Sequence, residues 1–367
     1  MLIDKRYLRY FDWVSFFLIF ILSAIGLLFV FSATYKPDLP FSLFFKKQLF
    51  GVLSGFLIYF IFCLIDFRTI MRWGYFLYFA VIGLLLFTII KGSIGMGAQR
   101  WINLGIVKVQ PSELAKLFFP TYAAYYFYTE KETLQFQFKE FIPILIMLLF
   151  SCLLIRKQPD LGTAILLGIS GLLVIWFAGM NKKFFLISFL VLAISTPVTW
   201  HFLKPYQKKR VLVFLGHGES KKERYQIEQS EIAIGAGGLT GSGILKGTQN
   251  KLQFLPESRT DFIFSVIAEE TGFIGVLTLL CLFGFLFFRF LVVIQSVKSP
   301  FFQLLALGVV SHVIFAALIN ICMVTGLLPV VGIPLPFISY GLSNLWVTFA
   351  SLGLFNGIAI RRFYFGE

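Results

Sequence analysis

The sequence predicts an all-α membrane protein that crosses the bilayer about ten times. Apolar residues make up 58% of the 367-residue chain and charged residues only 14%, with a mean hydropathy of +0.85. A soluble domain, in contrast, has about 25% charged residues. The apolar residues also fall into long runs, and a helix needs about 20 of them in succession to cross a bilayer. The whole chain, residues 1–367, is therefore expected to form a single integral membrane domain.

The apolar runs predict ten spans along the chain. In order, they cover residues 12–32, 46–65, 72–90, 111–128, 141–156, 161–179, 183–203, 271–294, 301–325 and 340–360. The seventh and eighth spans are separated by a large polar loop at about 204–260. Because the number of spans is even, both ends of the chain are expected on the same side of the membrane.

The distribution of Lys and Arg predicts which side that is. The short loops on the side of the termini carry 13 of these residues, and the short loops on the other side carry 8. Positively charged short loops tend to stay in the cytoplasm, so both termini are expected there, with the protein in the cytoplasmic membrane. The 204–260 loop is expected outside, since long loops cross largely regardless of charge. The net charge of +14 then reflects contact with anionic lipid or phosphate rather than nucleic acid.

The first candidate for catalysis is Asp261, at the outer boundary of the membrane. Pro256 breaks any helix that precedes it, and an apolar segment follows it. One interpretation is that Thr260 or Asp261 simply caps the helix that begins there. The other is that Asp261 is a catalytic base, because a carboxylate where membrane meets water is partly desolvated. Glu257 adds an acidic group nearby and is a further candidate for substrate binding.

A second candidate comes from the motif QPSELAKL at 110–117. Pro111 suits the first turn of a helix, and Glu113 and Lys116 are three residues apart, so they share one helix face. Opposite charges one turn inside a membrane helix must face protein or water. They form either a structural ion pair or a site in which Glu113 holds Lys116 for an anionic substrate.

Further cations are expected on the outer side, where they contact lipid headgroups or form a phosphate-binding surface. The candidates for substrate binding among them are Arg100, Lys157 and Arg210. No metal site is predicted, because the three His residues are scattered and the four Cys lie in apolar runs. The glycine-rich stretch 235–247 lacks the Gly-Lys-Ser/Thr of a nucleotide loop and is expected to form tight turns with close backbone approach.

Residues 326–341, GLLPVVGIPLPFISYG, carry three prolines and no charge. They cannot form a straight helix. Non-helical backbone at membrane depth is tolerated only where protein or a cavity covers it. This segment is therefore expected to be a re-entrant element that lines a site.

Together these motifs resemble those of the SEDS family of polytopic glycosyltransferases. The matching stretches are GAQRWINLG, QPSELAKL, KQPDLGTA, QSEIAIGAGGLTGSG, GTQNKLQFLPESRTDFIFSVIAEETGF and MVTGLLPVVGIPLPFISYG, in the family's order. GAQRW and GIPLPF are more similar to the elongation branch of the family than to the division branch. The chain departs from the family pattern at Arg259, where a His is usual, and at Leu342, where a Gly is usual.

The resemblance implies a ten-helix fold that polymerises lipid II into β-1,4 glycan strands on the outer face of the membrane. Asp261 matches the family's essential aspartate and is expected to be the general base. A class B penicillin-binding protein, which cross-links the product, is the implied partner within the elongation machinery. The sequence leaves open whether a divalent cation, Mg²⁺ or Mn²⁺, takes part.

Two other functions were weighed against this one. A lipid II flippase would need polar groups on both sides of the bilayer midplane, whereas the distinctive polar clusters here lie at the outer ends of predicted spans. A non-catalytic scaffold gives no reason for the charges of Asp261, Glu113 and Lys116. Glycosyl transfer explains them, because an acceptor hydroxyl needs a base and a pyrophosphate leaving group needs cationic stabilisation.

Overall fold

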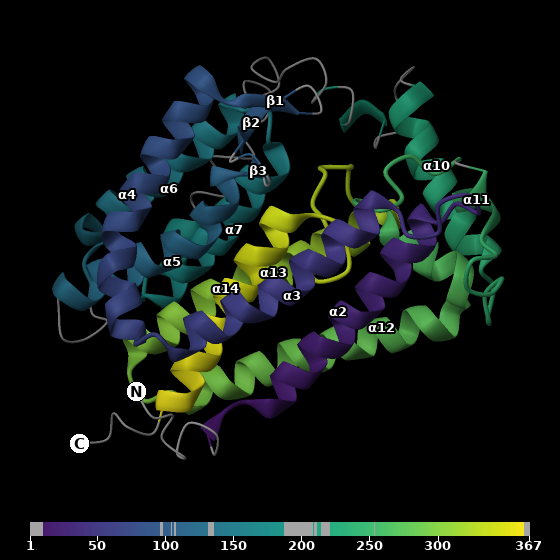
Figure 1. Ribbon diagram of the computed structural model, residues 1–367. Helices are drawn as coiled ribbons and strands as arrows, with labels where there is room; N and C mark the ends of the chain where they lie inside the picture. The colour runs from purple at the N-terminus through teal and green to yellow at the C-terminus, as the bar shows by residue number, and fades with distance from the viewer. Residues whose placement is uncertain are drawn as a thin grey trace.

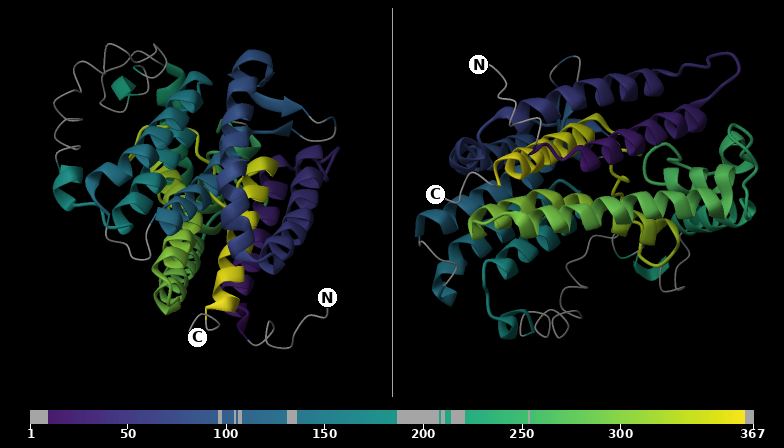
Figure 2. Two further views of the ribbon diagram at one scale, coloured as in Figure 1. Left: turned by 90° about the vertical axis from the view of Figure 1, so that its left-hand side faces the viewer. Right: turned by 90° about the horizontal axis from the view of Figure 1, so that it is seen from below.

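The computed structural model is a bundle of long helices (Figures 1 and 2). It describes residues 10–95, 98–103, 105, 108–130, 136–186, 208, 211–213, 221–252 and 254–362. The helices are α2 (Trp13–Thr34), α3 (Leu43–Leu64), α4 (Phe67–Lys91), α5 (Pro111–Glu130), α6 (Phe138–Lys157), α7 (Leu161–Phe177), α10 (Lys221–Ala236), α11 (Thr248–Lys251), α12 (Ile263–Ser296), α13 (Pro300–Val324) and α14 (Leu342–Arg361).

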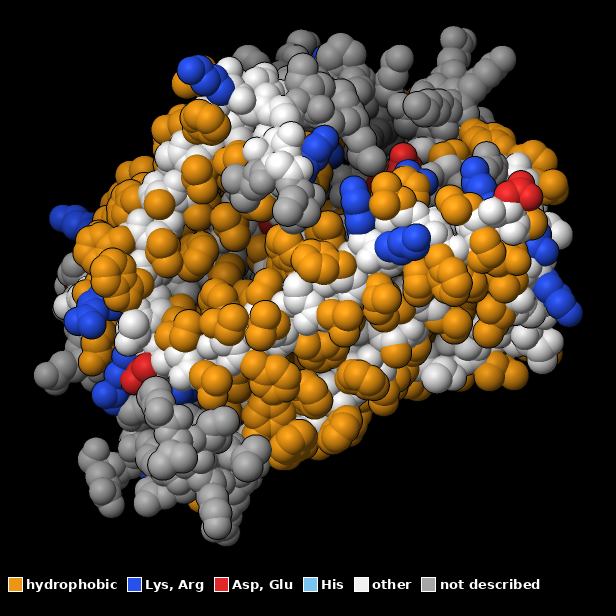
Figure 3. Space-filling model, in the orientation of Figure 1, with side chains coloured by type: hydrophobic (Ala, Val, Ile, Leu, Met, Phe, Trp, Pro, Cys, Tyr) orange, Lys and Arg blue, Asp and Glu red, His pale blue; other side chains and the backbone are white. Residues whose placement is uncertain are grey.

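Seven helices of the described chain are long and apolar enough to cross a membrane, namely α2, α3, α4, α6, α12, α13 and α14. Figure 3 shows a face on which hydrophobic side chains form a broad band, with Lys and Arg lying mainly toward its margins. Helices α5 and α7 coincide with the predicted spans 111–128 and 161–179. The predicted span 183–203 lies mostly outside the described residues. A multi-pass membrane protein is thus confirmed, whereas the count of ten spans stays a prediction.

The two ends of the described chain lie side by side. Asp12, directly before α2, accepts a hydrogen bond from Arg289 Nε at 2.9 Å, and its backbone N–H donates to Asn356 Oδ1 of α14 at 3.1 Å. These contacts hold the start of α2, the far end of α12 and the end of α14 together at one end of the bundle. Helices α10 and α11 lie at the opposite end (Figure 1).

The all-α prediction misses one element, a three-stranded antiparallel sheet between α4 and α5. Its strands, in the order β1–β2–β3, are β1 (Ser93–Gly95), β2 (Ala98–Asn103) and β3 (Lys108–Val109). The strands are too short to give a clear alternating pattern in a chain this apolar. The sheet matters for the site because β2, which carries Arg100, contacts α5.

The predicted polar loop 204–260 contains α10, α11 and a glycine-rich stretch. This stretch makes backbone hydrogen bonds to both sides of an interruption in α12. Gly272, within α12, has φ 66° and ψ −164°, so the regular helical hydrogen bonds are interrupted there. Four backbone bonds replace them, Ser242 N to Glu269 O (2.9 Å), Gly243 N to Glu270 O (3.0 Å), Phe273 N to Gly238 O (2.8 Å) and Ile274 N to Leu239 O (3.2 Å). Such replacement is needed because unpaired backbone groups are costly at membrane depth.

The glycines of this stretch have the role that the sequence predicted. Gly238, Gly241 and Gly243 have positive φ angles. A Cβ at Gly241 would also collide with the backbone of Glu270 in α12. Tight turns and close backbone approach are therefore confirmed.

The proline-rich segment between α13 and α14 is non-helical and deeply packed. Leu335, Phe337 and Ile338 are buried within the core. A Cβ at Gly26 of α2 would collide with the backbone of Phe337, so this glycine permits the segment to approach α2. Protein therefore covers the irregular backbone, which is what non-helical backbone at membrane depth needs. Its re-entrant position in the membrane stays a prediction.

Candidate active site

Asp261 lies in the turn directly before α12, at the end of the bundle that α10 and α11 cover. Its side chain is half-buried. The N-cap position of α12 belongs to Phe262, and no side-chain cap hydrogen bond is made there. The hydroxyl of Thr260 instead donates to Glu257 O at 3.2 Å. Neither Thr260 nor Asp261 therefore occupies the N-cap position of α12.

The backbone that carries Asp261 is held by three donors. Tyr340 N donates a hydrogen bond to Arg259 O at 2.9 Å. Ser339 Oγ donates to Thr260 O at 2.6 Å. Asn320 Nδ2 donates to Asp261 O at 2.9 Å. All three donors come from α13 or from the proline-rich segment, far away in sequence. The turn is thereby fixed, and the directions in which the side chains of Arg259 and Asp261 leave it are fixed as well.

The carboxylate of Asp261 faces Gly332 of the proline-rich segment. A Cβ added at Gly332 would lie 3.5 Å from Asp261 Oδ2. The φ of Gly332 is 76°, a backbone conformation that favours glycine. The backbone can therefore pass beside the carboxylate without a side chain filling the space next to it.

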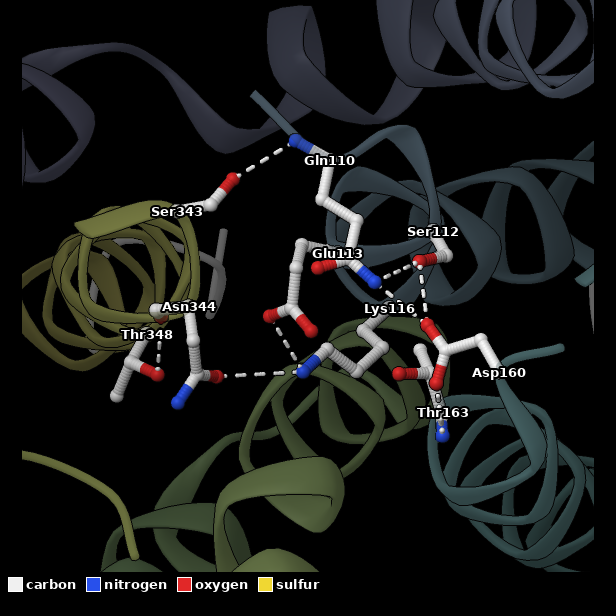
Figure 4. A network of polar contacts seen from close by, with 9 residues as sticks. All are labelled: Gln110, Ser112, Glu113, Lys116, Asp160, Thr163, Ser343, Asn344 and Thr348. Atoms are coloured by element: carbon white, nitrogen blue, oxygen red, sulfur yellow. Dashed lines mark hydrogen bonds and ion pairs between the residues drawn. The ribbon is translucent and has the colours of Figure 1, made fainter. Parts of the chain in front are cut away.

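Lys116 and Glu113 form the ion pair that their spacing predicts (Figure 4). The distance between Lys116 Nζ and Glu113 Oε2 is 2.7 Å, and the two side chains are 2% and 7% exposed. Lys116 Nζ also donates to Asn344 Oδ1 of α14 at 3.3 Å. Removing one partner of such a buried pair typically costs about 3–5 kcal/mol of stability. The structural part of the role is therefore evident, and substrate binding by Lys116 stays a prediction.

Asp160, within the stretch KQPDLGTA, is the centre of a second network of polar contacts. It begins α7, because its Oδ1 accepts from Thr163 N at 3.3 Å. Its Oδ2 also accepts from Gln110 Nε2 at 2.5 Å and from Ser112 Oγ at 3.2 Å. Arg100 Nη1 lies 3.6 Å from Oδ1. Arg100 is thus already paired with a carboxylate, which makes it a weaker candidate for substrate binding.

The stretch 331–344 contacts both the turn that carries Asp261 and the polar residues at the start of α5. Its Ser339 binds the turn that carries Asp261. Its Ser343 Oγ, at the start of α14, accepts from Gln110 N at 3.0 Å (Figure 4). The candidate base and the polar start of α5 therefore share one supporting element.

The remaining predicted site residues are Lys157, Arg210 and Glu257. Lys157 is an exposed side chain in the last turn of α6, and Arg210 lies outside the described residues. Glu257 is exposed, has φ 52°, and accepts a hydrogen bond from Thr260 through Oε2 at 3.2 Å. Its visible role is to shape the turn before Asp261. Among the described residues, no group of three or more His, Cys, Asp or Glu side chains could hold a metal ion.

Asn320 was missed by the sequence interpretation, although a signal was available. It is a fully buried amide within a mainly apolar span. Polar residues inside membrane helices usually face the bundle and find partners there. That rule alone would have marked Asn320 as a residue that holds another element in place.

The fold and these contacts define a multi-pass helical membrane protein with a carboxylate-bearing polar site at one end of the bundle. Residues 12–363 match the model of the family described as "Cell cycle protein", which covers FtsW, RodA and SpoVE. The chain therefore belongs to this family, and the resemblance to the SEDS proteins is confirmed.

Relatives with assigned names agree with this. The chain is 38% identical over 319 residues to "Peptidoglycan glycosyltransferase MrdB" of Escherichia coli (strain K12), with 86% of each chain covered. It is 33% identical over 371 residues to the protein of the same name in Helicobacter pylori (strain ATCC 700392 / 26695), covering 100% of this chain and 94% of the relative.

Two solved structures are similar in fold. One is described as "Structural coordination of polymerization and crosslinking by a peptidoglycan synthase complex", with a TM-score of 0.81, 28% identity, and 96% of this chain and 98% of the other covered. The other is the Rod shape determining protein RodA of Thermus thermophilus, with a TM-score of 0.72, 26% identity and the same coverage. The prediction of a RodA-like fold is therefore confirmed.

Proposed function

We propose that this protein is a peptidoglycan glycosyltransferase that polymerises lipid II into β-1,4 glycan strands during cell elongation. The activity is supported by family membership and by relatives that carry the name of a glycosyltransferase rather than a transporter. The role of Asp261 as general base is supported by its fixed turn and by the glycine that faces its carboxylate.

In the proposed reaction, the hydroxyl of an acceptor sugar attacks the anomeric carbon of the lipid-linked donor. Asp261 takes the hydroxyl proton as the new carbon–oxygen bond forms. The bond between the anomeric carbon and the pyrophosphate breaks, and its electron pair leaves with undecaprenyl pyrophosphate. A single displacement inverts the α-linked donor to a β-linked product, so no second carboxylate nucleophile is needed.

The negative charge that develops on the leaving group needs a cation in the site. Lys116 is one candidate, since it is buried and is held by Glu113 and Asn344. Glu113 would then position Lys116, and the pair would serve both the fold and the donor.

The partner and the membrane arrangement are part of the same proposal. A class B penicillin-binding protein is the proposed partner, because a similar chain belongs to a complex that coordinates polymerisation and crosslinking. The proposed location is the cytoplasmic membrane, with both termini in the cytoplasm and Asp261 on the outer face. The positive charge of the short loops supports this orientation.

The experiment is to supply purified full-length protein with lipid II, with and without the transpeptidase, and to resolve the products on a gel. Glycan polymer is the expected product. Movement of labelled lipid II across proteoliposome membranes without polymer formation would overturn the proposal in favour of transport.

A further inference from the structure

Arg259 is a cationic residue two positions before Asp261, the candidate base. Its guanidinium carbon lies 4.0 Å from the centroid of the Phe44 ring, at the start of α3. A guanidinium over an aromatic face is attracted by the ring quadrupole. Tyr340 packs edge-on against the same ring, with centroids 5.4 Å apart. The side chain of Arg259 is thus fixed by aromatic contacts rather than by an acid.

No carboxylate among the described residues neutralises Arg259. Described ion pairs include those of Arg100, Lys116 and Arg289, and none of them involves Arg259. Arg259 Nε is buried and makes no hydrogen bond. A guanidinium has five N–H donors and no acceptor. A fixed, half-buried arginine with donors to spare is arranged to receive an anion from outside the fold.

The nearby Tyr340 does not supply that anion. A tyrosine hydroxyl ordinarily has a pKa near 10, so it is neutral at physiological pH. Within the part of the chain that the structure describes, the positive charge of Arg259 therefore has no anionic partner.

Arg259 lies close enough to Asp261 for its charge to act on the proposed reaction. It lies two positions before Asp261, with only Thr260 between them, so their Cα atoms are at most about 7 Å apart. Both side chains leave a turn whose carbonyls are held by donors from α13 and the proline-rich segment. In a sugar-linked pyrophosphate, the anionic groups adjoin the carbon at which a nucleophile activated by Asp261 would attack. An anion at Arg259 and a sugar at Asp261 fit this arrangement.

We propose that Arg259 binds the pyrophosphate of the lipid-linked donor and stabilises its charge as it leaves. This inference rests on the proposed function. Unlike Lys116, which is already paired with Glu113, Arg259 has its charge available in the described chain. Arginine also suits this task chemically, because its planar fork can donate two parallel hydrogen bonds to phosphate. An anionic lipid headgroup offers the same chemistry and is the source to be distinguished.

The test compares Arg259→Gln, Arg259→Lys and the wild-type full chain in lipid II polymerisation, with inorganic pyrophosphate as inhibitor. We expect Arg259→Gln to lower kcat/KM by about 10- to 100-fold, and to weaken pyrophosphate inhibition by a similar factor, because a charged hydrogen bond is lost. Arg259→Lys should lie in between, since the charge remains but the fork does not. The control Lys47→Gln removes an exposed cation from the same end of α3 and should change both values by no more than about twofold.

Phe44→Leu provides a second variant that keeps the cation and removes its support. It should weaken pyrophosphate inhibition less than Arg259→Gln does. It also keeps the test valid if Arg259→Gln fails to fold, as judged by size-exclusion chromatography.

Two results would overturn the inference. One is unchanged pyrophosphate inhibition in Arg259→Gln. The other is an activity loss that appears only in vesicles containing phosphatidylglycerol and not in phosphatidylcholine alone, which would assign Arg259 to a lipid headgroup. Failure of the proposed function would look different, because the wild-type protein itself would then form no polymer from lipid II.

Discussion

The side-chain amide of Asn320 bonds the backbone of Asp261 to the proline-rich segment. Its Nδ2 lies 2.9 Å from Asp261 O and 2.7 Å from Ile333 O, and the residue is fully buried in α13. One amide nitrogen carries two N–H donors, so it can satisfy both carbonyls. The position of the candidate base and the position of the segment that faces it therefore depend on the same side chain.

The first prediction concerns Asp261 itself. Asp261→Asn keeps the size of the side chain but removes its ability to accept a proton. Loss of a general base typically lowers the rate by about 10²–10⁴-fold. We expect this loss in kcat for lipid II polymerisation, with unchanged expression and unchanged binding of the transpeptidase. Near wild-type turnover by Asp261→Asn would remove Asp261 from the mechanism.

The second prediction concerns Asn320 as a positioning residue. Asn320→Ala frees the turn at Asp261, and displacement of a catalytic group by about 1 Å can cost about 10²-fold in rate. We expect kcat to fall by about 10- to 100-fold with little change in KM. Loss of the two hydrogen bonds should also lower the free energy of unfolding by about 1–3 kcal/mol.

The matched control for Asn320 is Asn356, another buried amide, at the opposite end of the bundle. Its Nδ2 donates to the Tyr59 hydroxyl at 2.6 Å, and its Oδ1 accepts from Asp12 N. Asn356→Ala should lose a similar amount of stability while keeping kcat. If the two variants lose kcat equally, Asn320 acts on stability alone and not on Asp261.

The sequence predicted the spans well where hydropathy decides the structure. The predicted ranges 12–32 and 301–325 lie within two residues of Trp13–Thr34 and Pro300–Val324 at each end. The break at Gly272 was not predicted. The backbone groups that stabilise it come from residues 238–243, far enough away in sequence that no local pattern reports them.

The site was predicted in the same uneven way. Asp261 and the pair Glu113–Lys116 could be identified because a charge in an apolar chain stands out. The partners of Asp160 and Asn320 could not be identified, because they come from segments far away in the sequence. The bond from Asn320 to Asp261, for example, spans 59 residues. Hydropathy and motif spacing carry no information about such contacts.

The third prediction separates the two roles of the Glu113–Lys116 pair. Either single reversal should lower the free energy of unfolding by about 3–5 kcal/mol, because a like-charged buried pair is left. The double variant Glu113→Lys with Lys116→Glu restores opposite charges. Asn344 does not oppose the exchange, since its amide can rotate to donate to a carboxylate.

If Lys116 also contacts the donor, the exchanged pair should recover stability but not polymerisation. The reason is that the cation would move by about one helical turn, roughly 5 Å. Thermal unfolding and lipid II turnover of the three variants measure the two effects separately. Full activity in the double variant would return the pair to a purely structural role.

The fourth prediction concerns the side of the membrane on which α11 lies. Lys251 is exposed in α11, and Lys298 is exposed between α12 and α13. In a background without the four native cysteines, Lys251→Cys should react with a membrane-impermeant thiol reagent added to intact cells. Lys298→Cys should react only after the membrane is opened. The reverse labelling pattern would invert the topology and exclude catalysis on the outer face.

The last prediction tests whether the glycine-rich stretch supports the break in α12. Gly241 has φ 78°, and a Cβ there would collide with the backbone of Glu270, on the side of the break that leads to Asp261. Gly241→Ala should therefore introduce strain of about 1–3 kcal/mol from the backbone angle alone, and the collision should add to it. The helix from Ile263 to the break carries the turn at Asp261 on its other end, so activity should fall along with stability.

Gly235 offers the matched control within the same segment. It lies in α10, its φ is not in the left-handed region, and a Cβ there would meet nothing within 4 Å. Gly235→Ala should leave activity unchanged and raise stability by up to about 1 kcal/mol, because alanine favours the helix. Thermal unfolding of the two variants in detergent, with lipid II turnover measured in parallel, gives the comparison. If Gly241→Ala matches Gly235→Ala in both measurements, the backbone bonds across Gly272 do not hold the start of α12 in place.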